Sequence, residues 1–141
     1  MSTAAAPVRG LLDTNAVILL EHFDPSSLPD EALISAVTLA ELSAGPLVAA
    51  DDTERASRQA RLQRAEADFD ALPFDADAAR AFGAVAAALR QSGRKVAARA
   101  YDAMIAATAL ARDLPLFTCN PDDFRSIPGL TVMVLPHPGR P

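Results

Sequence analysis

The sequence predicts an α/β fold in which a small, mainly parallel β-sheet is flanked by helices. Short apolar segments typical of strands alternate with longer helix-forming segments, an order that favours parallel strands joined by helices. Half of the residues are hydrophobic and few are aromatic, and the many alanines indicate that helix dominates. The length of 141 residues suits one domain with a sizeable core, so we expect residues 1–141 to form a single domain.

Local signals place the individual elements. Strands are predicted where short apolar segments lie between turn signals, at 8–12, 32–36, 72–75, 115–118 and 131–135. Helices are predicted between them, at 15–22, about 38–42, 51–71, 76–91 and 98–112. The first helix is expected to be capped by Asp13, Thr14 or Asn15, and the helix at 76–91 to end at Ser92-Gly93. Whether the helix at 38–42 resumes after Gly45-Pro46 stays open.

Composition indicates a soluble, cytoplasmic protein. Cys119 is the single cysteine, so no intrachain disulfide can form, which suits a reducing compartment. The first ten residues lack the pattern of a signal peptide, and no apolar stretch approaches the roughly 18 residues of a membrane span.

Charge gives a mixed indication about nucleic acids. The formal net charge of −5 counts mildly against binding through overall charge. The basic residues are unevenly placed, however, and one acid-free segment contains Arg90, Arg94, Lys95 and Arg99. A solvated helix surface and an exposed basic loop remain two interpretations of this segment, because Ser92-Gly93 interrupts it.

Acidic residues fall where ligands bind in parallel α/β sheets, outside the carboxyl ends of the strands. Asp13 ends the first strand, and Asn120 and Asp123 follow the strand at 115–118. Glu41 and Asp102 lie in helices from which they can reach the same edge. We therefore expect residues that are far apart in the sequence to meet in one acidic pocket.

Such a cluster suits a hard divalent cation. Carboxylates that lie close together repel one another, and Mg²⁺ or Mn²⁺ relieves this repulsion while keeping several waters. The bound cation activates water and stabilises charge on a phosphoryl oxygen. The absence of His and Cys from the predicted set argues against zinc.

Each acid also has a purely structural interpretation. Asp13 can be a helix N-cap, and Asp102 can complement the dipole of its helix. Glu41 can be a surface residue, and Asp123 can belong to the turn NPDDF. The hypothesis of a site rests on their combination.

In combination, the motifs resemble those of the PIN-domain ribonucleases, in particular the VapC-type toxins of bacterial type II toxin–antitoxin pairs. The resemblance extends over nearly the whole chain and keeps the family's order and spacing. It rests on LLDTNAVI at 11–18, ISAVTLAEL at 34–42, YDAMIAATAL at 101–110 and LFTCNPDDFRSIPGL at 116–130. It implies the PIN-like three-layer α/β/α fold and metal-dependent hydrolysis of RNA phosphodiester bonds.

The resemblance also implies a role for each residue. Asp13 and Asp102 would be the principal metal ligands, with Mg²⁺ or Mn²⁺ as the cofactor, and Glu41 the remaining central acid. The family's fourth acidic position falls on Asn120 or Asp123, and we favour Asp123, oriented by Asn120, as an outer or water-mediated ligand.

The remaining implications concern the pocket wall and the partners. Thr14 and Thr118 match hydroxyls that line the pocket and contact a phosphate or a carboxylate, so they join Asn120 as substrate-binding candidates. The family implies a homodimer and a small VapB-type antitoxin that covers the site with a basic side chain.

Other functions stay open at this stage. A catalytically silent PIN-like binding module would keep the fold and a protein partner without cleaving RNA. A receiver-like signalling domain also gathers acids around Mg²⁺, but it requires a lysine near a strand end, and the single lysine, Lys95, falls in a predicted loop. A phosphatase with a second aspartate two residues after Asp13 is set aside, because that position is Asn15.

Overall fold

The computed structural model describes residues 6–139, and in this part of the chain five strands form one parallel sheet in the order β3-β2-β1-β4-β5. The strands are β1 (Arg9–Leu12), β2 (Glu31–Ser35), β3 (Ala71–Leu72), β4 (Leu116–Thr118) and β5 (Val132–Val134). The α-helices are α1 (Thr14–Ile18), α2 (Ala36–Ala44), α3 (Asp52–Asp68), α4 (Ala76–Gln91) and α5 (Ala100–Ala111). No helix among these residues is long and apolar enough to cross a membrane.

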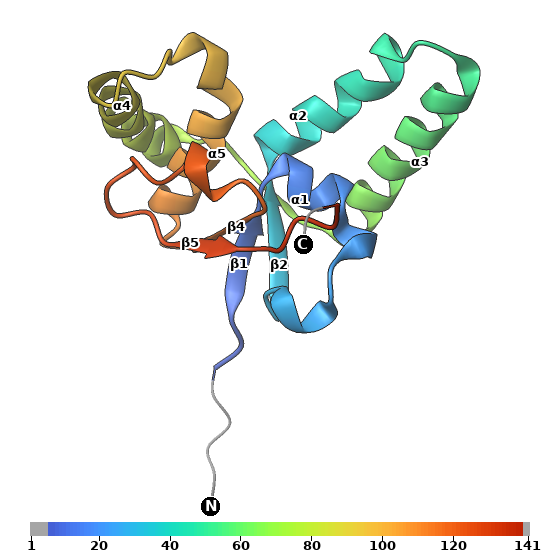
Figure 1. Ribbon diagram of the computed structural model, residues 1–141, viewed down its shortest axis with the longest axis horizontal. Coiled ribbons are helices and arrows are strands. Elements are labelled where there is room, and N and C mark those ends of the chain that lie inside the picture. The colour runs from blue at the N-terminus through green and yellow to red at the C-terminus, as the bar shows by residue number, and fades with distance from the viewer. Residues whose placement is uncertain (1–5, 140–141) are drawn as a thin grey trace, which may run out of the picture.

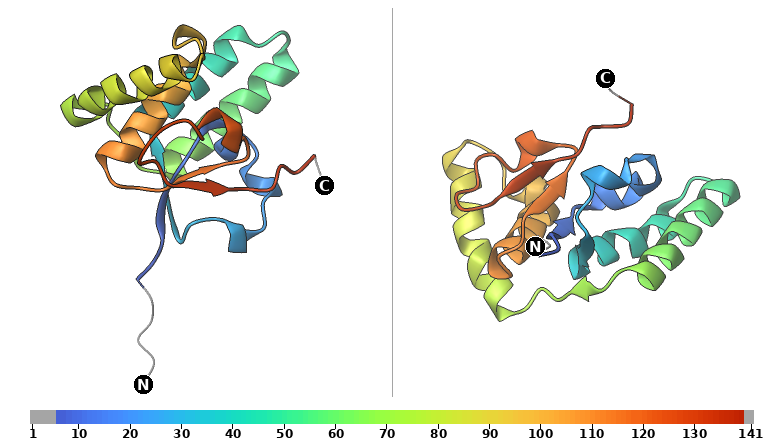
Figure 2. Two further views of the ribbon diagram at one scale, coloured as in Figure 1. Left: turned by 60° about the vertical axis from the view of Figure 1, so that its left-hand side comes forward. Right: turned by 90° about the horizontal axis from the view of Figure 1, so that it is seen from below.

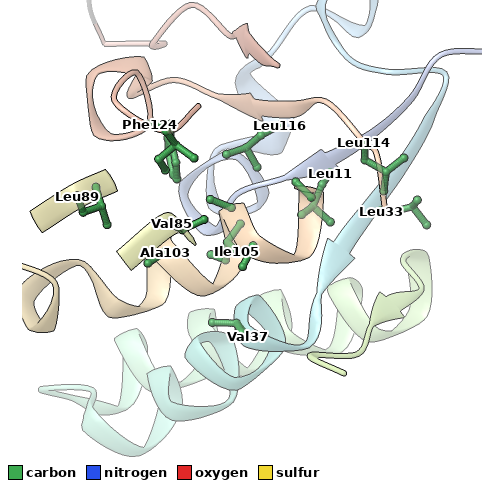
Figure 3. Packing of buried hydrophobic residues seen from close by; sticks show 14 residues of the cluster. Leu11, Leu33, Val37, Val85, Leu89, Ala103, Ile105, Leu114, Leu116 and Phe124 are labelled. Atoms are coloured by element: carbon green, nitrogen blue, oxygen red, sulfur yellow. The ribbon is translucent and has the colours of Figure 1, made fainter. Parts of the chain in front are cut away.

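Helices cover both faces of the sheet, as Figures 1 and 2 show, so the predicted three-layer α/β/α class is confirmed. Alternation along the strands produces the two faces. Leu11 and Leu116 pack with α4 and α5, in the cluster drawn in Figure 3. Their neighbours Leu12 and Phe117 point the other way and pack with residues of α1 and α3.

Polar caps fix where the helices begin. Ser35, Asp51 and Asp75 accept backbone N–H bonds at the starts of α2, α3 and α4, respectively. The Ser35 cap begins α2 at Ala36, slightly earlier than predicted. The helix predicted at 76–91 is confirmed with those bounds.

The structure corrects several predicted boundaries. The strand predicted at 72–75 is wrong in position: β3 ends at Leu72, because Pro73 has no N–H for the ladder and Asp75 already caps α4. The helix predicted at 15–22 ends at Ile18, and a 3₁₀ turn follows at Leu20–His22. After α2 the chain continues as a 3₁₀ turn at Gly45–Val48 and not as α-helix.

Candidate active site

The candidate site lies at the carboxyl edge of the sheet, beside β1 and β4. These strands are neighbours, and Leu12 of β1 pairs with Phe117 of β4. In the sheet, β2 lies on one side of β1 and β4 on the other, so the strand order reverses at β1. Parallel α/β sheets bind ligands at such a switch point. The next residue on each strand, Asp13 and Thr118, therefore faces the same crevice.

Asp13 is held by two hydrogen bonds. Its Oδ1 accepts from the backbone N–H of Ala16 at 2.9 Å, which makes it the N-cap of α1. Its Oδ2 accepts from the hydroxyl of Thr118 at 2.6 Å. Burial raises the pKa of the Asp13 carboxyl, and these two hydrogen bonds oppose the rise. Asp13 is thus both a helix cap and a member of the acidic cluster.

Glu41 reaches the site from α2 and is oriented by a row of hydroxyl groups. The Thr14 hydroxyl donates to Oε1 of Glu41 at 2.7 Å. Because its proton is used there, Thr14 accepts from the Thr38 hydroxyl at 3.0 Å, and Thr38 accepts from Ser35 at 3.4 Å. Consecutive donors of this kind polarise one another and fix the carboxylate in one orientation.

Asp102 lies in the first turn of α5 and shows most clearly how negative charge converges. Burial, and after it the charges of Asp123, Asp13 and Glu41, raise its pKa to about 6, while the charge of Arg99 opposes the rise. Asp102 and Glu41 line the same cavity, of about 440 Å³, together with Arg99 and Tyr101. The carboxylates of Asp13, Glu41, Asp102 and Asp123 therefore act on one another across this edge.

Asp123 forms an ion pair with an arginine of the same chain. The Arg99 guanidinium donates to its Oδ1, and an Arg94 nitrogen lies 3.9 Å from the same oxygen. Asn120 contacts Asp123 through the backbone, because the Asp123 N–H donates to the Asn120 carbonyl at 3.2 Å. The Asn120 amide side chain is directed towards the sulfur of Cys119, at 3.8 Å.

The donor set is one that a hard cation prefers. It consists of carboxylate and hydroxyl oxygens, without histidine or thiolate ligands. Burial is the main cause of the raised pKa of Asp102, and the neighbouring carboxylates add to the rise although Arg99 opposes it. In residues 6–139, however, no three His, Cys, Asp or Glu side chains lie together as a ready coordination sphere. The chemistry of the residues thus fits Mg²⁺ or Mn²⁺, although they are not gathered as ligands.

Some contributors were not predicted from the sequence as members of the site. Thr38 is fully buried and joins the hydroxyl row, and its signal was its polar character three residues before Glu41 on the same helix. Arg99 stands three residues before Asp102, but its sequence context gave only a basic segment. The contact between Arg99 and Asp123 could not be predicted, because only the fold brings these two residues together.

Comparisons with known proteins match one family over most of the chain. The PIN-domain family profile matches residues 10–130. The chain is 42% identical over 132 residues to ribonuclease VapC5 of Mycobacterium tuberculosis, which covers 92% of this chain and 93% of that protein. It is 28% identical to a ribonuclease VapC of Rickettsia bellii, covering 89% of this chain and 96% of that protein.

Solved structures resemble the fold over most of the chain. The VapBC-5 toxin–antitoxin structure from M. tuberculosis superposes with a TM-score of 0.75 at 42% identity, covering 89% of this chain and 94% of that one. The DNA-bound VapBC of Salmonella typhimurium gives a TM-score of 0.70 at 28% identity, with 89% and 96% covered. The PIN-domain match at residues 10–130 includes Asp13, Glu41 and Asp102.

Proposed function

The chain belongs to the PIN-domain family, and from this premise we propose that residues 1–141 form one domain, the toxin of a type II toxin–antitoxin pair. Its activity is that of a metal-dependent endoribonuclease, which hydrolyses RNA phosphodiester bonds. The observation that carries the proposal is the convergence of Asp13, Glu41 and Asp102 at one edge of the sheet. Glu41 and Asp102 line one cavity, and the charges of Asp13 and Glu41 contribute to the raised pKa of Asp102. Curated relatives named as ribonucleases support the choice of substrate.

Asp13 and Asp102 are the proposed metal-holding residues, and Asp123 is an outer member of the acidic set. A hard divalent cation at this position supplies charge neutralisation and Lewis-acid activation of the phosphodiester. Mg²⁺ and Mn²⁺ both suit oxygen ligands of this type. A bound cation also lowers the electrostatic cost of bringing a polyanionic substrate to the carboxylates.

The protein's own groups orient the reaction. Thr118 and the N–H of Ala16 hold Asp13 in one position, so little ordering remains to be done when substrate binds. The Thr14 hydroxyl donates to Oε1 of Glu41, and no described residue donates to the second oxygen, Oε2. We assign Glu41 Oε2 as the group that accepts a proton from, or orients, the attacking water.

The predicted substrate-binding residues divide by what their polar groups already contact. The hydroxyl protons of Thr14 and Thr118 are directed at carboxylates, so both act on substrate by positioning Glu41 and Asp13. Asn120 retains an amide whose contact with sulfur is weak, and we propose it as the direct hydrogen-bond donor to RNA.

A VapB-type antitoxin is the proposed protein partner, and a homodimer the proposed assembly. The structural relatives that carry toxin–antitoxin names support the first. On this chain, Leu47 is 86% and Val48 72% exposed. Val48 lines a cavity of about 310 Å³ together with Thr14 and Glu41, and Leu47 precedes it in the chain. An apolar surface beside the site suits a partner segment that crosses it and delivers a cation to the carboxylates.

The test is cleavage of total bacterial RNA by the purified chain with Mg²⁺ or Mn²⁺, with EDTA, and with Asp13→Asn. Discrete cleavage that requires both metal and Asp13 supports the ribonuclease and identifies its class of target. A folded wild-type chain that cleaves no RNA under any metal contradicts it, and then the silent binding module becomes the better description.

A further inference from the structure

A second and larger cavity lies outside the acidic cluster, along α4. Its volume is about 830 Å³, and its floor is formed by the small residues Gly83, Ala86 and Ala87. A side chain built at Gly83 would meet nothing within 4 Å, so the floor is open to a ligand. The cations Arg90, Arg94 and Lys95 line the same cavity, and none of its lining residues is acidic. We refer to this cavity, defined by Arg90, Arg94 and Lys95, as the basic groove.

Two of the three cations are available for an external anion. Arg90 and Lys95 are exposed, and neither forms an ion pair with any residue between 6 and 139. This is unusual in the chain, because many of its other arginines pair with nearby acids, Arg55 and Arg80 being examples. Positive charge left uncompensated on an acidic chain indicates an anionic ligand.

Arg94 has a different position and fixes the wall of the groove. It donates to the Asp122 carbonyl oxygen at 2.7 Å and lies 3.9 Å from Asp123. A second nitrogen of its guanidinium, Nη1, is buried without a hydrogen-bond acceptor. The loop after α4 is therefore attached to the loop after β4, and the groove is held in a fixed relation to the catalytic edge.

The basic groove and the active site are lined by consecutive residues of the chain. It ends at Val96, and the next residue, Ala97, already lines the cavity that contains Glu41 and Asp102. Arg99 continues the line of cations to Asp123. In Figure 1 the α4–α5 connection lies at the end of the molecule where the strands have their carboxyl ends, next to the start of α5.

We propose that the basic groove binds the sugar–phosphate backbone of the RNA on one side of the phosphodiester that is cut. The inference rests on the proposed ribonuclease function and names a binding site outside its carboxylates. Arg90 and Lys95 contact successive phosphates, and the small floor lets the strand approach α4 closely. Contacts of this kind supply affinity and register without reading the bases.

The charge pattern favours RNA over a second copy of this chain as the occupant. A two-fold contact through this face would set the patch against itself. Arg90 and Lys95 would then approach the same cations of the other copy, with no lining acid to compensate them. A polyanion has the complementary charge along its whole length.

The experiment compares two double variants that lose the same charge. Arg90→Ala/Lys95→Ala removes the groove cations. The control, Arg9→Ala/Arg55→Ala, removes two arginines whose partners are Glu31 and Asp52, away from the groove. The affinity for a short fluorescent single-stranded RNA is measured by anisotropy in EDTA, over a series of KCl concentrations. Light scattering gives the molecular mass of each variant, and circular dichroism its fold.

We expect the groove variant to bind RNA about tenfold more weakly than wild type near 0.1 M salt. The slope of log K against log[salt] should become shallower by about 1.4, because two phosphate contacts are lost at about 0.7 each. With Mn²⁺, KM should rise while kcat is retained, and the control should remain within about twofold of wild type. Lys95→Glu alone should weaken binding in the same direction.

Equal affinity and slope in the groove and control variants would overturn the proposal, and so would a wild type that does not bind the RNA. A change of molecular mass in the groove variant would overturn it as well, because the surface would then be a contact between copies. These results are separable from failure of the proposed function. Wild-type cleavage in Mn²⁺ with no effect of the groove variant rejects the groove alone, whereas no wild-type cleavage rejects both.

Discussion

Replacing Asp102 by Asn should stabilise the protein when metal is absent. The Asp102 carboxyl has a pKa of about 6 in the fold, against an ordinary value of 3.8, because it is buried and faces the charges of Asp123, Asp13 and Glu41. At neutral pH its ionised form is therefore less favourable in the folded chain than in the unfolded chain. Asparagine has nearly the same shape and no charge, so it removes this cost.

The magnitude follows from the shift. A difference of about two units, at about 1.4 kcal/mol each, sets an upper limit of about 3 kcal/mol at pH 7.5. Because Asp102 is only partly buried, solvent screening reduces the expected gain to about 1–2 kcal/mol. A pKa that is raised by folding has a definite sign. The unfolded chain releases the Asp102 proton above about pH 4 and the folded chain only near pH 6. Stability attributable to Asp102 therefore falls as pH rises through this window, and the cost is absent below it.

The assay is thermal unfolding of wild type and Asp102→Asn in EDTA at pH 7.5 and near pH 4, and again with Mn²⁺. In EDTA the variant should unfold higher by about 3–10 °C at pH 7.5, with the difference disappearing near pH 4. Metal at a hundredfold excess over its Kd should raise the free energy of unfolding of the wild type by about 2.7 kcal/mol. The free energy of unfolding of the variant should not change. The exposed control Glu66→Gln should match wild type throughout.

Two outcomes would refute this reasoning. If Asp102→Asn lowers the unfolding temperature in EDTA at pH 7.5, the ionised carboxylate is not a cost to the fold. If the variant's gain persists near pH 4, its origin is not the charge. A variant that Mn²⁺ stabilises as strongly as wild type would remove Asp102 from the proposed metal ligands.

Further predictions concern other contacts. Thr118→Val removes the donor to buried Asp13, so urea unfolding at pH 7.5 should show a free energy of unfolding lower by about 2 kcal/mol. Thr118→Ser keeps the hydroxyl and should retain most of the wild-type stability. Arg99→Ala removes the guanidinium that competes with a metal ion for the carboxylates. Thermal shifts should then show that Mn²⁺ binds about fivefold more tightly, and an unchanged affinity for Mn²⁺ would argue against this competition. Gly10→Ala places a Cβ against the Phe117 ring, and its chemical unfolding should show a loss of about 2 kcal/mol; wild-type stability would contradict the observed packing.

The sequence predicted the order and type of the elements well, because local signals decide them. The helix at 76–91 lies between a capping aspartate and Ser92-Gly93, and its bounds were predicted correctly. Boundaries that depend on neighbouring strands were less accurate. Two-residue β3 exists because Ile34 and Ser35 of β2 pair with it, and the sequence around Pro73 does not show where that pairing stops.

The acidic positions were identified from the sequence because strand ends mark the ligand edge of a parallel sheet. In the fold the charges of Asp13 and Glu41 contribute to the raised pKa of Asp102, which agrees with that expectation. Their roles as metal ligands and catalysts remain predictions. The sequence did not predict that Asp123 is paired with Arg99, since neither residue's local pattern indicates a partner 24 positions away.

By itself, then, the sequence determined the alternation of strands and helices, their caps, and which acids stand at strand ends, because hydrophobic periodicity and capping act over a few residues. The tertiary structure decided the rest. It joined Thr118 to Asp13 across 105 residues and set Arg99 against the carboxylates. It also raised the pKa of Asp102 and gathered the cations of the basic groove in a cavity along α4. These properties depend on burial and on distances between remote segments, which exist only once the sheet has formed.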